Sequence, residues 1–316
     1  MLQATTQGLY LHIPFCHQRC HFCAFYLEIH HARAAEEFVA SLLTELGVYG
    51  KSGVLGANPL DSIYFGGGTP TTLSSDQLAT ILATATTTFG LSPDAEVTIE
   101  AHPESVTRDS LTHLRQSGFN RLSFGAESMD QTELNRVGRP GSPASTTTTM
   151  AVAREAGFTN INLDLMYGLP GQTLESWATS LRHTIELDPN HLSCYALTIE
   201  EGTSLKTAIQ RGLVPAPDEE LQNRMEDLAE EILSRAGYER YEISNHCRHG
   251  FASRHNRLHW TGGHYLGIGP SAQSYLGGRR FGNVSDLRAY NAALKDGRLP
   301  VSESDRLTQA DESCER

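Results

Sequence analysis

The stretch Gly8-Leu-Tyr-Leu-His-Ile-Pro-Phe15, followed at once by Cys16-His-Gln-Arg-Cys20-His-Phe-Cys23, decides how this chain is interpreted. An apolar strand runs into a loop that carries three cysteines at C-x3-C-x2-C spacing. Three thiolates this close together can hold three irons of a [4Fe–4S] cube and leave the fourth iron without a protein ligand. That open iron can bind the amino and carboxylate groups of S-adenosylmethionine, whose reductive cleavage supplies a 5′-deoxyadenosyl radical.

A structural zinc site is the alternative for the same loop, with the three cysteines joined by His17 or His21. Structural zinc sites usually pair two CxxC-like knuckles, and the sequence holds no second knuckle. We therefore favour Cys16, Cys20 and Cys23 as the ligands of an iron–sulfur cluster.

Length and charge exclude several classes of protein. The chain has 316 residues, and 25 basic against 37 acidic residues give a formal charge of −12. No Lys/Arg-rich run is present, so we expect no nucleic-acid partner. The sequence has neither an apolar run long enough for a membrane span nor a secretory signal. Clustered cysteines rather than a disulfide framework fit a reducing, cytoplasmic location.

Strand-like and helix-like segments alternate with short connections. We expect strands at Leu9–Ile13, Ser62–Phe65, Glu96–Glu100, Arg121–Gly125, Asn160–Leu165 and His191–Ala196. The helices expected between them are Arg33–Gly47, Ser75–Phe89, Thr107–Gln116, Pro143–Ala156 and Leu174–Leu187. Six βα repeats with right-handed crossovers predict an α/β fold with an open (β/α)6 partial barrel, although a doubly wound sheet has the same order of elements.

The repeat stops after Ala196. We expect an acidic helix at Asp218–Ala236, a short strand at Tyr238–Ile243, a His- and Gly-rich loop from Asn245 to Gly282, and the opening of a polar helix at Asp305–Arg316. This pattern divides the chain into a core, residues 1–215, and an incomplete C-terminal region, residues 216–316. A sheet edge left uncovered by that region predicts self-association or marginal stability.

Glycines and acids follow other strands of the predicted sheet. Gly66-Gly67-Gly68-Thr69-Pro70 lets backbone N–H groups approach a ligand closely, although a tight turn is a sufficient explanation. Glu100 ends the third strand and could take an ammonium group, and Asp164 ends the fifth and could accept from ribose hydroxyls. Either acid alone could be a capping or surface residue. Their shared position at strand ends favours a ligand site.

Five segments together resemble the radical SAM family of oxygen-independent coproporphyrinogen III oxidases and their haem-chaperone relatives. They are Tyr10–Cys16, the cysteine triad, Tyr64-Phe-Gly-Gly-Gly-Thr-Pro70, Thr98-Ile-Glu-Ala-His-Pro103 and Asp164-Leu-Met-Tyr-Gly-Leu-Pro170. The resemblance runs from about Leu9 to Ala293. It implies a radical SAM partial barrel with a family-specific C-terminal extension, here truncated, and a cluster on the three cysteines. It also implies S-adenosylmethionine contacts from Tyr10, Phe22, Ala24, Gly67, Gly68, Thr69, Glu100, Arg139, Asp164 and Ala196. Glu127 stands where relatives carry Gln, keeping an acceptor but losing the amide donor.

Three features favour the chaperone branch. Phe25 stands where the oxidases have a further Cys, and only 15 residues precede Cys16. His255-Asn-Arg-Leu-His-Trp260 resembles a His-Asn-x-x-Tyr-Trp motif of the chaperones, with His259 in place of Tyr. By this resemblance His255 and Trp260 bind haem, which the protein passes to haem-accepting proteins. A hydrogen-bonded anchor is the alternative role for His255.

Two other functions stay open at the sequence level. The first is coproporphyrinogen III oxidation, whose tetracarboxylate substrate needs Arg or Lys clamps. The candidates for such clamps are few: Arg19, Arg139, Arg254, Arg279 and Arg280. The second is a zinc-stabilised interaction protein.

Overall fold

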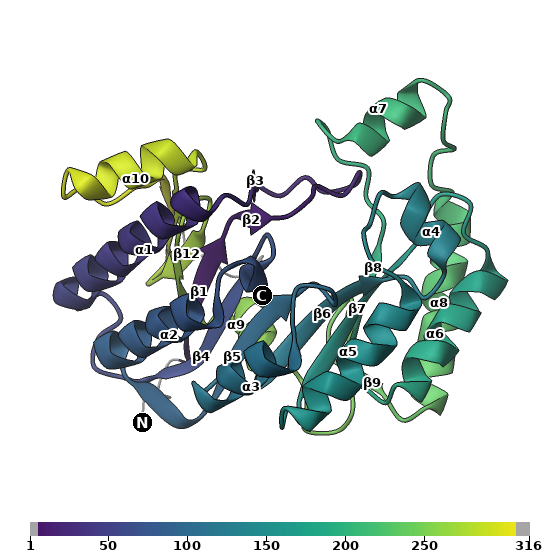
Figure 1. Cartoon of the computed structure of the whole chain (residues 1–316), viewed down its shortest axis with the longest axis horizontal. Helices are drawn as coiled ribbons and strands as arrows, with labels where there is room; N and C mark the ends of the chain where they lie inside the picture. The colour runs from purple at the N-terminus through teal and green to yellow at the C-terminus, as the bar shows by residue number, and fades with distance from the viewer. Residues whose placement is uncertain (1–5, 308–316) are drawn as a thin grey trace.

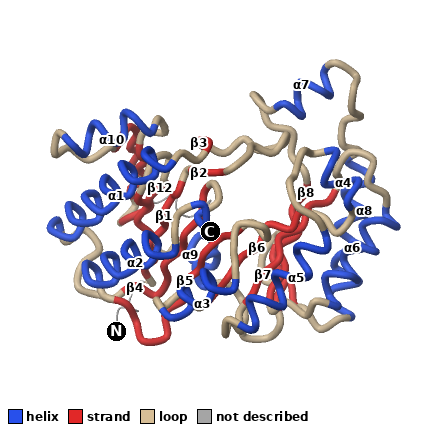
Figure 2. The backbone as a smooth tube through the Cα atoms, in the orientation of Figure 1, coloured by secondary structure: helices blue, strands red, loops and turns tan. Residues whose placement is uncertain are grey.

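One twelve-stranded sheet organises residues 6–307, which a computed structural model describes (Figure 1). Its strand order is β14-β13-β12-β11-β1-β4-β5-β6-β7-β8-β10-β9. Six consecutive strands are parallel and confirm the predicted βα repeats: β1 (Gln7–Ile13), β4 (Leu60–Gly67), β5 (Leu91–Ala101), β6 (Arg121–Glu127), β7 (Ile161–Tyr167) and β8 (His191–Ala196). The sheet curves without closing, so the predicted open barrel is confirmed (Figure 2).

Helices cover the outer face of the curved sheet (Figures 1 and 2). On β1 the residues that face them, Leu9, Leu11 and Ile13, are fully buried, whereas the alternate residues Tyr10 and His12 face the inside of the barrel. The covering helices are α1 (Ala32–Ser52), α2 (Ser75–Phe89), α3 (Arg108–Gln116), α5 (Pro143–Glu155), α6 (Leu174–Glu186) and α8 (Glu219–Arg235). Shorter helical segments are η1 (Pro70–Thr72), α4 (Gln131–Arg136) and α7 (Ser204–Gln210).

Threonine-rich segments are helical despite their weak helix propensity. In α2 the hydroxyls of Thr80, Thr84 and Thr87 each donate to the carbonyl four residues earlier. In α5 the hydroxyl of Thr147 does the same toward Pro143. These bonds satisfy the hydroxyls within the helix, and the apolar faces of both helices supply the packing.

The C-terminal region departs most from the sequence-based expectation. The loop predicted from Asn245 to Gly282 is wrong, because it folds into β10 (Asn245–Cys247), α9 (Arg254–Thr261), β11 (His264–Ile268), β12 (Gln273–Leu276) and β13 (Arg279–Asn283). The strand expected near residue 240 is β9 (Glu239–Arg240), and α10 (Leu287–Lys295) follows β13. Where a polar helix was expected to open, β14 (Val301–Arg306) instead pairs with β13, and the rest of that predicted helix lies outside the described residues.

Both edges of the six-stranded core are extended by later parts of the chain. β11 pairs with β1 in parallel, and β10 pairs with β8 antiparallel. The premise that a core edge stays uncovered is therefore wrong, and self-association stays a prediction without that support. The division at residue 215 also stays a prediction, since both parts contribute strands to the one sheet. Between residues 6 and 307, no helix is both long and apolar enough to cross a bilayer.

Candidate cluster and cofactor site

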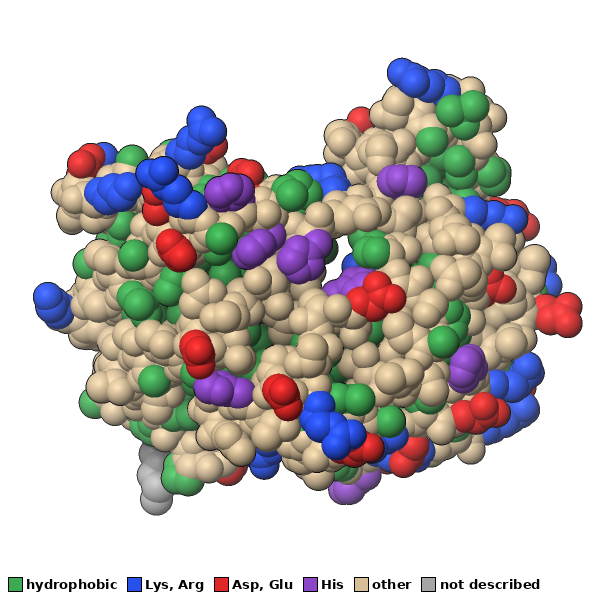
Figure 3. Space-filling view, in the orientation of Figure 1, with side chains coloured by type: hydrophobic (Ala, Val, Ile, Leu, Met, Phe, Trp, Pro, Cys, Tyr) green, Lys and Arg blue, Asp and Glu red, His purple; other side chains and the backbone are tan. Residues whose placement is uncertain are grey.

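The cysteine loop lies across the open end of the barrel (Figure 1). Cys16 ends β2 (Phe15–Cys16), and Cys20 and Cys23 follow in the loop that leads to β3 (Glu28–Ile29). All three are free thiols. Figure 3 shows a hollow beneath this loop, with histidine side chains gathered around it. Because β1 and β4 are parallel, the loop meets the glycines that end β4 at the same edge of the sheet.

Hydrogen bonds within the cysteine loop and to other segments of the chain hold the loop in place. The Arg19 guanidinium donates to the carbonyls of Cys23 at 3.2 Å, Phe25 at 3.4 Å and Leu27 at 3.1 Å. The backbone N–H of His21 donates to the carbonyl of Val137 at 2.9 Å. The His21 carbonyl in turn accepts from the N–H of Leu205 in α7 at 2.9 Å. The loop therefore bridges from β1 to the far side of the barrel.

Polar groups approach the thiols. Burial raises the pKa of Cys16, and a hydrogen bond with the Thr69 hydroxyl, 3.4 Å from its sulfur, opposes that rise. Burial also raises the pKa of Cys20, opposed by Arg139, whose guanidinium lies 3.5 Å from the Cys20 sulfur. A ligating cysteine must lose its proton, so these two contacts favour the thiolate forms that a cluster requires.

The described residues contain no preformed zinc site. Among the described residues, no group of three or more His, Cys, Asp or Glu side chains lies close enough to hold a single metal ion. A cubane cluster has no need for its ligands to converge on one point, because each cysteine binds a different iron. The three free thiols on one loop, with Thr69 and Arg139 beside them, thus fit an iron–sulfur cluster.

Glycines after β4 pack the turn against the cysteine strand. Gly67 has a φ of 111°, and a Cβ there would lie 2.8 Å from the His12 ring. A Cβ on Gly68 would lie 2.6 Å from the Phe15 carbonyl oxygen. The N–H of Thr69 donates to the same carbonyl at 2.7 Å. Only glycine allows this approach, which keeps the backbone beside Cys16 open to a ligand.

Three carboxylates from neighbouring strands face the inside of the barrel near this turn. Glu100 accepts from the Tyr64 hydroxyl at 2.8 Å and from the Gly67 N–H at 3.3 Å. Asp164 accepts from the Asn162 amide at 2.8 Å and from the Ser123 hydroxyl at 3.2 Å. Glu127 has a φ of 64°, in the left-handed region, and lies 3.4 Å from the Arg139 guanidinium.

Crowding of these acids favours a positively charged ligand. Burial first, and then the charge of Asp164, raise the pKa of Glu100 to about 7. Burial and Asp164 likewise raise the pKa of Glu127 to about 7, although Arg139 opposes the shift. Burial also raises the pKa of Asp164. A ligand with an ammonium and a sulfonium group, such as S-adenosylmethionine, would supply the missing positive charge.

The structure brings most of the predicted cofactor residues to this end of the barrel. The Tyr10 ring stacks near Tyr64 at a centroid distance of 6.2 Å. Phe22 packs against a small apolar cluster that includes Leu205 of α7. Ala24 and Ala196 are exposed, beside Cys23 and at the end of β8 respectively.

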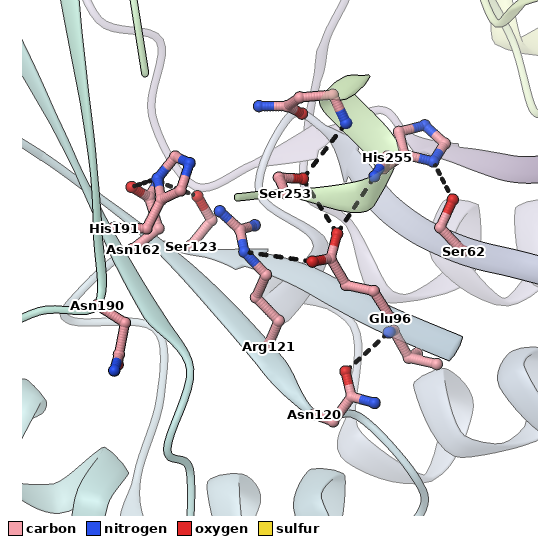
Figure 4. A network of polar contacts seen from close by, with 12 residues as sticks. Ser62, Glu96, Asn120, Arg121, Ser123, Asn162, Asn190, His191, Ser253 and His255 are labelled. Atoms are coloured by element: carbon pink, nitrogen blue, oxygen red, sulfur yellow. Dashed lines mark hydrogen bonds and ion pairs between the residues drawn. The ribbon is translucent and has the colours of Figure 1, made fainter. Parts of the chain in front are cut away.

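His255 and Trp260 come from a different element, although the His255 ring borders this group, 5.1 Å from that of Tyr64 and 6.3 Å from that of Tyr10 between centroids. His255 and Trp260 lie on α9, which contacts the first halves of β1 and β4, at the other end of the strands from the cysteines. The His255 Nδ1 atom is 2.9 Å from the Ser62 hydroxyl, and the residue is 3% exposed (Figure 4). Trp260 is 48% exposed. Arg254, a candidate clamp for carboxylates, is also on α9 and pairs with Asp94 at 2.8 Å.

Sequence reasoning missed the buried polar network that fixes α9. Glu96 accepts from the Ser253 hydroxyl at 3.0 Å and from the His255 N–H at 3.3 Å, with Arg121 on its other side at 4.0 Å (Figure 4). Ser253 is also the N-cap of α9, and its hydroxyl accepts from the Asn256 N–H. A serine two residues before His255 was the available signal for a helix start.

Comparison with known proteins identifies the family of this chain. Residues 10–183 match the sequence model of the Radical SAM superfamily. The chain is 36% identical over 303 residues to a protein of Mycobacterium tuberculosis named Heme chaperone HemW, covering 95% of this chain and 77% of the relative. The chain belongs to the HemW family of radical SAM proteins.

A second relative and one solved structure also match this HemW family member. A protein of Bacillus subtilis, also named Heme chaperone HemW, is 34% identical over 304 residues, which cover 96% of this chain and 79% of that protein. The solved structure of coproporphyrinogen III oxidase (HemN) from Escherichia coli, a radical SAM enzyme, matches with a TM-score of 0.86 at 27% identity. That match covers 98% of this chain and 74% of the HemN chain. The HemN-like fold thus extends over nearly all of this HemW family member.

Proposed function

We propose that this chain is a cytoplasmic haem chaperone, which binds haem and passes it to haem-accepting proteins. The observation that carries the proposal is the likeness, over 95% of the chain, to a protein named Heme chaperone HemW. The absence of a membrane-crossing helix between residues 6 and 307 is compatible with the proposed location. Haem binding by α9, through the motif from His255 to Trp260, is part of the proposal.

We further propose that Cys16, Cys20 and Cys23 hold a [4Fe–4S] cluster, with S-adenosylmethionine beside it. When bound, the pair supplies one-electron chemistry that side chains cannot provide. Glu100 would orient the ammonium group, Asp164 the ribose hydroxyls, and the Gly67–Thr69 backbone the amino-acid end. Tyr10, Phe22, Ala24, Glu127, Arg139 and Ala196 would complete the contacts.

Coproporphyrinogen oxidation is the second candidate, favoured by the structural match to HemN. The arrangement of the arginine side chains is unfavourable for this second function. Arg19 is engaged with loop carbonyls, Arg139 lies against Glu127, and Arg254 pairs with Asp94 at the far end of the strands. Arg279 donates to Ser304 at 2.7 Å. A tetracarboxylate would have to displace several of these contacts to be clamped.

Anaerobic assay of the reconstituted protein with coproporphyrinogen III tests the choice. We expect cluster absorption and haem binding, with porphyrinogen conversion no faster than in a control without protein. Turnover to protoporphyrinogen IX well above that control would overturn the chaperone proposal in favour of the oxidase.

A further inference from the structure

His255 is built into the protein interior. Its Nδ1 atom is 2.9 Å from the Ser62 hydroxyl, and its ring packs beside two aromatic rings, 5.1 Å from that of Tyr64 and 6.3 Å from that of Tyr10 between centroids. Only 3% of the residue is exposed (Figure 4). The other ring nitrogen, Nε2, is buried, so a planar macrocycle cannot reach it in this arrangement of α9 and its neighbours.

Displacing α9 would be costly. Glu96, itself buried, accepts from the Ser253 hydroxyl and from the His255 N–H, so movement of α9 would leave a buried carboxylate without these donors. Leu258 packs so closely on β1 that a Cβ at Gly8 would lie 2.4 Å from it. These contacts assign His255 a structural role.

One helical turn later, His259 differs from His255 in exposure, although the two ring centroids lie 5.5 Å apart. It is exposed, and its ring nitrogens make no hydrogen bond within residues 6–307. Its ring centroid lies 4.4 Å from that of Tyr265, and the next residue, Trp260, is 48% exposed.

The neighbouring strands add aromatic and basic groups on the same face. Gly8 pairs with Tyr265, Tyr265 with Tyr275, and Tyr275 with Arg280. Paired residues project to one face of a sheet, and at Gly8 that face is the one that α9 covers. Tyr265 and Tyr275 are only partly buried, so α9 ends beside an aromatic surface with a basic residue in the same row.

We propose that His259 is the axial ligand of the haem iron, with Trp260, Tyr265 and Tyr275 as the surface against which the macrocycle lies. An imidazole with a free nitrogen beside partly exposed aromatic rings matches the chemistry of a metalloporphyrin. This inference rests on the proposed function, because haem binding comes from there.

Ferric haem titration of the full chain tests the ligand. His259→Phe keeps a ring against Tyr265 and removes the nitrogen, and His113→Phe, at a partly exposed histidine of α3, is the matched control. We expect His259→Phe to shift the Soret band and to weaken haem binding about tenfold or more, with the control like wild type. Because neither histidine is buried, both variants should fold, which circular dichroism checks.

Each result has a separate meaning. A His259→Phe protein with the wild-type spectrum overturns the ligand assignment, whether or not its affinity falls, and leaves the proposed function standing. A wild-type protein without saturable haem binding overturns both. Loss of the wild-type spectrum in His259→Phe alone supports the assignment.

Discussion

The carboxylate of Glu45 in α1 accepts a hydrogen bond at 2.6 Å from the hydroxyl of Tyr290 in α10, 245 positions later in the chain. The same buried side chain accepts from the Gly269 N–H at 2.9 Å and from the Asn283 amide at 2.7 Å. One residue of the first helix thus ties together the loop after β11, the end of β13 and α10. Burial raises the pKa of Glu45 to about 7, although all three donors oppose the shift.

This raised pKa makes stability depend on pH in a defined direction. A carboxyl whose pKa is higher in the folded state than in the unfolded state contributes stability below its unfolded pKa of about 4.5, and that contribution is lost as the pH rises through about 7. We expect Glu45→Gln to remove this dependence, on the order of 2 kcal/mol between about pH 5 and about pH 8, in urea unfolding. Glu37→Gln, on the exposed face of α1, is the control, and parallel curves for wild type and Glu45→Gln would refute the prediction.

Iron content separates the loop cysteines from the others. Cys20→Ala should abolish the fourfold iron–sulfur load, because two thiolates hold a cubane poorly. Cys194→Ala and Cys247→Ala, which remove buried thiols of β8 and β10, should retain it. Iron and sulfide analysis after anaerobic reconstitution measures both, and equal iron loss in Cys247→Ala and Cys20→Ala would show that the three-ligand assignment is wrong.

Arg19 should control how firmly the cluster is held. Its three hydrogen bonds to the carbonyls of Cys23, Phe25 and Leu27 order the loop before any iron binds. We expect Arg19→Ala to release iron to a chelator roughly tenfold faster, since the loop then loses more freedom on binding the cluster. Arg33→Ala, at an exposed arginine of α1, is the matched control. Equal release rates would mean that the loop keeps its shape without Arg19.

Glu100 should decide cofactor affinity without affecting the cluster. Glu100→Gln keeps an acceptor for the Tyr64 hydroxyl but removes the charge that an ammonium group would meet. Equilibrium binding of S-adenosylmethionine to reconstituted protein should weaken about tenfold or more, at unchanged iron content. Glu104→Gln, at an exposed position three residues after β5, is the control. Unaltered affinity in Glu100→Gln would exclude the proposed ammonium contact.

The repeated part of the fold could be predicted because its local signals agree. The helix Ser75–Phe89 and the strand His191–Ala196 match the expected bounds, and Ser74 caps its helix with both bonds of a capping box. The sequence also predicted that Glu100 and Asp164 lie at the same edge of the sheet, because parallel strands end there.

The C-terminal strands could not be predicted, because their stability comes from distant partners. His264–Ile268 contains a glycine and follows Gly262 and Gly263, so it has the composition of a loop, and its pairing with β1 supplies the order. Val301–Arg306 is polar along most of its length because it pairs with β13 and remains largely exposed. The burial of His255 likewise depends on Ser62 and Glu96, which no local pattern connects to it.

Transfer of haem is the most direct test of the central claim. The reconstituted protein would be loaded with haem, freed of excess haem and mixed with an apo-haemoprotein under anaerobic conditions, while absorption spectra follow both partners. We expect the bound haem to move to the acceptor until its sites are filled or the donor is emptied. A protein that binds no haem saturably, or that keeps its haem in the presence of excess acceptor, would contradict the assignment of a haem chaperone.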